Sequence, residues 1–127
     1  MKDLRSPLAK VKGLGASGDA THHFWVQRLT ALALFPLVIW LSISIIALPD
    51  MSYEALVALF QNPFNAVMMI VLVLVSLHHG HLGMQVIFED YISTHGTRLA
   101  AILVTKFLSY FLMALGVYSV LKIALAG

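Results

Sequence analysis

Three long runs of apolar residues, separated by short polar segments, dominate the chain. They cover about residues 24–48, 63–88 and 98–126. Each run exceeds the roughly 20 residues that a helix needs to cross the hydrocarbon core of a bilayer. Backbone polar groups find no water at that depth, so each run is expected to be one helix. The pattern therefore predicts an all-α transmembrane fold with three membrane-spanning helices.

The segments between the runs contain signals for helix starts and turns. Residues 52–61 are too few to cross a membrane and predict a short interfacial helix. Asn62 followed by Pro63 is typical of an N-cap and the first helical position, so the second span should begin there. Residues 89–97 predict a polar turn, and Pro36 predicts a bend in the first spanning helix.

The composition supports the membrane class. Apolar residues make up 60% of the chain and charged residues 11%, whereas soluble chains carry about 25% charged residues. The length of 127 residues indicates a single domain, 1–127, in which the polar residues 1–21 are expected to form a flexible arm. The absence of cysteine excludes thiolate metal sites and cysteine nucleophiles. A net charge of +2 is too small to indicate a nucleic-acid partner.

The distribution of cations predicts the orientation. The loop at 49–63 has no Lys or Arg, whereas four precede the first span: Lys2, Arg5, Lys10 and Lys12. By the positive-inside rule, the N-terminal arm and the 89–97 loop are expected on the cytoplasmic or matrix side. No Arg/Ser-rich transit segment is present, so the inner membrane of a bacterium is favoured over the mitochondrial inner membrane.

Three histidines interrupt the second apolar run. Polar side chains at membrane depth are costly, and a group of them indicates a functional site. His78 and His81 are three residues apart and share one helix face, which Gln85 extends by a turn. His79 points in another direction, with Gly83 one turn further along its own side.

His79 and Gly83 suit an axial haem ligand. Imidazole is a standard ligand of haem iron, and a glycine one turn away removes a side chain that would block a flat macrocycle. A zinc site would need three or four convergent ligands, and these histidines diverge. The spacing alone leaves two alternatives open, namely hydrogen bonding between helices and a proton relay through His78 and His81.

Two further groups lie near the predicted membrane boundary. Arg28, together with His22, could bind haem propionates, and the alternative for Arg28 is a snorkelling anchor. Tyr91 could donate its hydroxyl to a quinone carbonyl while Asp90 relays protons. The alternative for Tyr91 is an ordinary aromatic-belt residue.

These residues together resemble a known family. His79-x-x-x-Gly83-Met84, followed by Asp90-Tyr91, resembles the small membrane-anchor subunit of succinate dehydrogenase, or respiratory complex II. The segment His22-His23-Phe24-x-x-x-Arg28-x-Thr30-Ala31 is similar to the first helix of that family. The chain has no Ser-x-x-His-Arg-x-Ser-Gly segment of the kind that the large anchor carries.

The resemblance implies a four-subunit complex made of a flavoprotein, an iron–sulfur protein, a large cytochrome b anchor and this small anchor. The anchors would share one haem b and pass electrons from the iron–sulfur subunit to ubiquinone, and this chain would not be catalytic alone. The implied roles are haem ligand for His79, quinone contacts for Tyr91 and Asp90, and propionate or second-shell positions for Arg28, His22, His78, His81 and Gly83.

Two alternative functions remain at the level of sequence. A fumarate reductase anchor would run the same chemistry in the opposite direction. A noncatalytic scaffold or transporter component would use its histidines to hold helices together.

Overall fold

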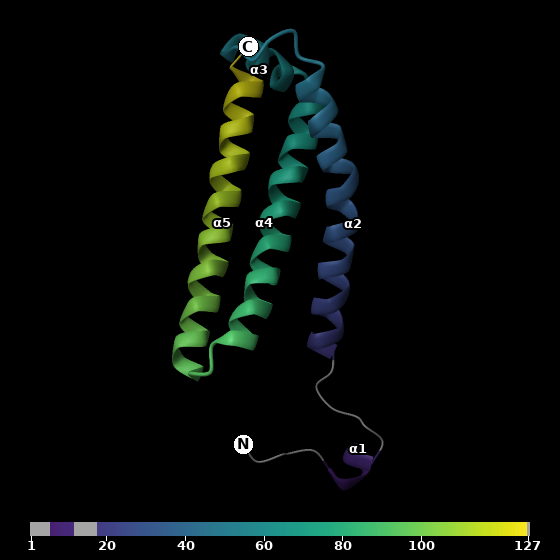
Figure 1. Ribbon diagram of the computed structural model, residues 1–127, viewed down its shortest axis with the longest axis vertical. Coiled ribbons are helices and arrows are strands. Elements are labelled where there is room, and N and C mark those ends of the chain that lie inside the picture. The colour runs from purple at the N-terminus through teal and green to yellow at the C-terminus, as the bar shows by residue number, and fades with distance from the viewer. Residues whose placement is uncertain (1–5, 12–17, 127) are drawn as a thin grey trace.

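The computed structural model describes residues 6–11 and 18–126 (Figure 1). Within these residues the chain forms α-helices joined by short connections. The helices are α1 (Pro7–Val11), α2 (Gly18–Ile46), α3 (Tyr53–Gln61), α4 (Pro63–Tyr91) and α5 (His95–Leu125).

The three long helices lie side by side, with α4 between α2 and α5 (Figure 1). The short helix α3 packs against α4 and α5 at the end of the bundle where the C-terminus lies. The start of α2 and the α4–α5 connection lie at the opposite end. Three helices are long and apolar enough to cross a membrane, over Thr21–Ile46, Pro63–Tyr91 and His95–Leu125, which confirms the predicted fold class.

Side-chain caps start α3 and α4 where the sequence predicts. The Ser52 hydroxyl oxygen accepts the backbone N–H of Ala55 at 3.2 Å. The Asn62 side-chain oxygen accepts the N–H groups of Phe64 at 3.0 Å and Asn65 at 3.4 Å. These bonds satisfy donors that a helix start leaves unpaired, and they confirm the predicted interfacial helix and the start of the second span.

The predicted polar turn at 89–97 is too long. Helix α4 continues to Tyr91 and α5 begins at His95, so three residues connect them. The backbone N–H of Ile92 still donates to the Phe88 carbonyl at 3.0 Å. Hydropathy marks where the hydrocarbon ends, but a helix can continue beyond it because water satisfies its polar side chains. The first span, by contrast, ends at Ile46, two residues before the predicted end.

Part of the arm predicted for residues 1–21 is helical, and its flexibility stays a prediction. Residues 7–11 form α1, which begins with proline at a position that suits it, and α2 begins at Gly18. Residues 1–5 and 12–17 lie outside the described part of the chain. Helix α2 continues through Pro36, and the bend expected there stays a prediction.

A close contact at Gly116 brings α5 against α4. A Cβ atom added at Gly116 would lie 2.7 Å from Val73 Cγ1 and 3.7 Å from Val73 Cβ. A valine in a helix has one strongly preferred rotamer, so Val73 cannot easily rotate away. In membranes, where lipid tails are as apolar as the side chains, such close packing is a main source of helix association.

We expect Gly116→Ala to weaken the α4–α5 contact. The added methyl group overpacks Val73, which typically costs about 1–3 kcal/mol and outweighs the gain of up to about 1 kcal/mol from better helix propensity. The thermal denaturation midpoint of the purified complex in detergent should fall. Gly96→Ala is the matched control, because a Cβ there meets no described atom within 4 Å. Adding Val73→Ala to Gly116→Ala should restore part of the loss, and equal midpoints for both glycine variants would contradict this packing role.

Candidate functional site

The histidines of α4 lie on two faces, as their spacing predicts. His78 and His81 line one cavity together with Gln85, whereas His79 lines a different cavity, against α2. Successive residues of a helix are about 100° apart, so neighbours in sequence meet different helices. The structure confirms this separation and places no group of three or more His, Cys, Asp or Glu close enough to hold a metal ion among the described residues.

His79 contacts α2 through a hydrogen bond. Its Nδ1 atom lies 3.0 Å from the Thr30 hydroxyl oxygen. That oxygen also lies 2.8 Å from the Val26 carbonyl and 3.0 Å from the Gln27 carbonyl. The only hydrogen bond of the His79 ring to the residues described here is this one, at Nδ1. The ring is therefore held at one nitrogen and available at the other.

The cavity beside His79 has a volume of about 300 Å³ and lies between α2 and α4. Its remaining lining residues all come from α2: Phe24, Gln27, Arg28 and Ala31. The Arg28 guanidinium carbon lies 5.2 Å from the centre of the Phe24 ring, a distance suited to a cation–π contact. This contact places a cation at the cavity that His79 lines, and the propionate contact expected of Arg28 stays a prediction.

Space is also open one turn along α4 from His79. A Cβ atom added at Gly83 would meet no described atom within 4 Å. The position is therefore open in this chain, and its use by a flat group stays a prediction.

His78 and His81 contact each other and α5. Their rings are 4.9 Å apart between centres, and the His81 ring lies 6.0 Å from that of Tyr110. His81 is 7% exposed, and its Nδ1 lies 3.3 Å from the Leu77 carbonyl, to which it can donate. The contacts between helices here are ring contacts, and the hydrogen bond of His81 stays within α4.

A second cavity, of about 240 Å³, lies between α2, α4 and α5. It is lined by His22, His23, Val26, His78, His81, Leu82, Gln85, Lys106 and Tyr110. His22 therefore lines this second cavity, not the one that Arg28 shares with His79. The Nε2 atom of His23 is buried there without a partner among the described residues.

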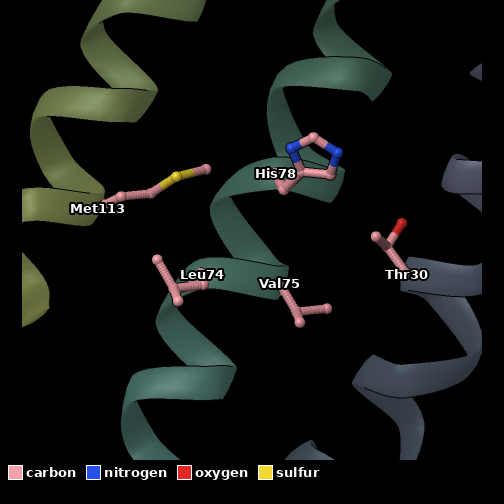
Figure 2. Close-up of a pocket in the computed structure, with 5 residues that line it drawn as sticks. All are labelled: Thr30, Leu74, Val75, His78 and Met113. Carbon is pink, nitrogen blue, oxygen red and sulfur yellow. The ribbon is translucent and has the colours of Figure 1, made fainter.

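Sequence analysis did not predict which α5 residues lie near His78 and His81. Lys106 and Tyr110 are four residues apart, and Met113 follows three residues later, so they share a helix face. Figure 2 shows Met113 of α5 and Thr30 of α2 on either side of His78, around a cavity of about 270 Å³. The spacing of these α5 residues was the available signal, but it does not say which α4 residues they meet.

Asp90 and Tyr91 lie in the last turn of α4, away from the histidines. Tyr91 is 84% exposed, and Asp90 is also exposed. The neighbouring Glu89 accepts a hydrogen bond from the Gln85 side-chain nitrogen at 2.9 Å. Because α4 is continuous, Tyr91 lies 12 residues and about 18 Å along the axis from His79. A quinone pocket at this end would need walls from other subunits.

Comparison with known proteins decides the family. The model of the succinate dehydrogenase/fumarate reductase transmembrane subunits matches residues 2–114. The chain belongs to this family. The succinate dehydrogenase hydrophobic membrane anchor subunit of Rickettsia bellii is 33% identical over 107 residues, covering 84% of this chain and 86% of that protein. The subunit of the same name from Paracoccus denitrificans is 30% identical over 122 residues, covering 96% and 94%.

The membership confirms the resemblance drawn from the residue pattern. A more distant relative, the succinate dehydrogenase membrane anchor subunit of Reclinomonas americana, is 26% identical and covers 72% of this chain. A transmembrane subunit of this family has to meet other subunits within the membrane.

Proposed function

We propose that this chain is the small membrane anchor of a succinate dehydrogenase and that His79 supplies one axial ligand to a haem b. The observation that carries the proposal is the placement of His79 and Arg28 in one cavity on the α2–α4 face. The names of the relatives support the succinate dehydrogenase assignment. One chain supplies one such histidine, so the second ligand comes from a large cytochrome b anchor.

The residues on this face fit a haem. His79 offers a free ring nitrogen, Gly83 leaves space beside it, and Arg28 can donate hydrogen bonds to a propionate. A haem held in this way supplies a one-electron carrier between the ferric and ferrous states. The protein contributes by fixing the imidazole, placing a cation near the carboxylates, and excluding water with apolar side chains.

The end of α4 fits the proposed quinone contact. The Tyr91 hydroxyl can donate a hydrogen bond to a quinone carbonyl, and the Asp90 carboxylate beside it can pass the protons that quinone reduction consumes. Both side chains are exposed and thus accessible to a ubiquinone held against partner subunits.

The proposed partners are a flavoprotein, an iron–sulfur subunit and the large anchor, in the cytoplasmic membrane of a bacterium. The start of α2 and the α4–α5 connection share one end of the bundle. The cations in the sequence favour the cytoplasm for that end. The iron–sulfur subunit would dock there, close to Tyr91.

A fumarate reductase anchor would use the same side chains, and the matching family includes both enzymes. Direction depends on the potentials of the cofactors and on the quinone, which other subunits largely set. The relatives named above are succinate dehydrogenase subunits, which favours oxidation of succinate. A scaffold without cofactor would leave the open cavity beside His79 without a role.

Replacing individual histidines should identify the haem ligand. We expect His79→Ala to abolish or strongly alter the reduced b-type absorption band of the purified complex, because it removes the ligating nitrogen. His78→Ala is the matched control and should keep the band, since His78 lies on the other cavity. Loss of the band in His78→Ala with retention in His79→Ala would move the ligand by one residue. Retention in both would overturn the haem role of this chain.

Tyr91→Phe should slow quinone reduction specifically. Loss of one hydrogen bond of about 1.4 kcal/mol corresponds to about a tenfold lower rate with ubiquinone. Succinate oxidation by an artificial soluble acceptor should be unchanged, because that reaction does not need the quinone site. Equal loss of both activities would indicate a structural role for Tyr91 and not a quinone contact.

The proposed orientation can be tested because the chain contains no cysteine. Ser93→Cys, in the α4–α5 connection, should react with a membrane-impermeant thiol reagent in inside-out vesicles. Met51→Cys, in the connection before α3, should react in right-side-out vesicles. The pattern is read on this subunit after separation of the complex, and the reverse pattern would place the N-terminus on the other side.

A further inference from the structure

The hydroxyl group of Thr30 has a specific place in the proposed haem site. Its oxygen lies within hydrogen-bond distance of three atoms: the carbonyl oxygens of Val26 and Gln27, and Nδ1 of His79. A threonine hydroxyl has one proton to donate and two lone pairs to accept with. This donor and acceptor capacity determines where the protons of the Thr30 and His79 hydrogen bonds lie.

The Thr30 hydroxyl donates its proton to a backbone carbonyl. Two oxygens 2.8 Å apart attract each other when a proton lies between them, and a carbonyl oxygen has none to give. Thr30 therefore donates to Val26, one helical turn earlier, as threonine in helices commonly does. The Thr30 oxygen is then an acceptor for His79, so the proton of that second bond must come from Nδ1.

This assignment fixes the tautomer of His79. A neutral imidazole with its proton on Nδ1 has its lone pair on Nε2, and the hydrogen bond of His79 to the residues described here is at Nδ1, which leaves Nε2 for a ligand. Histidines that bind metals usually donate their other ring N–H to a nearby acceptor, which fixes the orientation of the ring and makes the ligating nitrogen more basic. Thr30 is placed to be that acceptor.

We propose that Thr30 is a positioning residue that holds His79 in its Nδ1–H tautomer and sets the basicity of Nε2. The inference rests on the proposed role of His79 as a haem ligand and extends it to a residue on a different helix. The hydrogen bond also ties α2 to α4 at the level of the ligand. The redox properties of the haem would thus depend on how α2 packs.

The test compares Thr30→Val with Thr30→Ser in the assembled complex. Valine keeps the shape of threonine without the hydroxyl, whereas serine keeps the hydroxyl. We expect Thr30→Val to lose about 10–100-fold in haem affinity, the usual effect of removing such a partner. Its haem midpoint potential should rise, because a less basic ligand stabilises ferric iron less, and the low-spin ferric EPR signal should shift as the ring is freed. Thr30→Ser should stay close to the parent protein in all three.

Ser44→Ala provides the matched control. Ser44 lies on α2 and donates to the Trp40 carbonyl at 2.8 Å, one turn earlier, like Thr30. Its removal should change neither the haem affinity nor the potential. If Thr30→Val does not assemble, Thr30→Ala carries the same comparison, because it removes atoms and adds none.

The outcomes separate this inference from the proposed function. Loss of the haem in His79→Ala, together with an unchanged affinity, potential and EPR signal in Thr30→Val, would overturn the role of Thr30 alone. Retention of the haem in His79→Ala would overturn both. A parallel shift in Thr30→Val and Ser44→Ala would show a general effect of losing a hydroxyl from α2, and would also contradict the positioning role.

Discussion

The continuity of α4 through the membrane is the constraint on which the rest of the structure depends. A backbone in hydrocarbon must satisfy its own hydrogen bonds, so α4 runs from Pro63 to Tyr91 without a break. Each residue is then rotated by about 100° from the last. Because α4 lies between α2 and α5, that rotation sends His79 toward Thr30 and His81 toward Tyr110. Shifting α4 by one residue would rotate its side chains by about 100° and move His79 away from Thr30.

The helices could be predicted from the sequence because hydrophobic length and local capping largely determine them. Hydrophobic length identified the three spans, and local capping chemistry placed the starts of α3 and α4 at Ser52 and Asn62. The predicted boundaries between the second and third spans were less accurate. Helix α4 continues to Tyr91, and α5 begins already at His95. Polar residues beyond the hydrocarbon gain hydration whether they are helical or not, so composition does not mark the last turn.

The candidate site was predicted in part. Helical spacing separated His79 from His78 and His81, and the structure keeps them apart. Helical spacing did not predict that Thr30 contacts His79 or that Lys106 lines a cavity with His78 and His81. It also did not predict that His22 lines that second cavity. These pairings depend on how each helix is rotated about its axis, and contacts such as that of Gly116 with Val73 set this rotation. Such contacts are tertiary and cannot be derived from the periodicity of one helix.

Two glycines show how the chain divides its surface between internal packing and exposed chemistry. Gly116 lets α5 approach Val73 so closely that a methyl group would not fit, which makes α4 and α5 one packed unit. Gly83 faces open space, one turn from His79, whose Nδ1 is held by Thr30 and which we propose as one of two haem ligands. The exposed Tyr91 likewise presents a hydroxyl without an enclosing pocket of its own. A chain built in this way packs closely where α4 meets α5 and leaves His79 and Tyr91 open, so the activity proposed for it can arise only at its boundary with partner subunits.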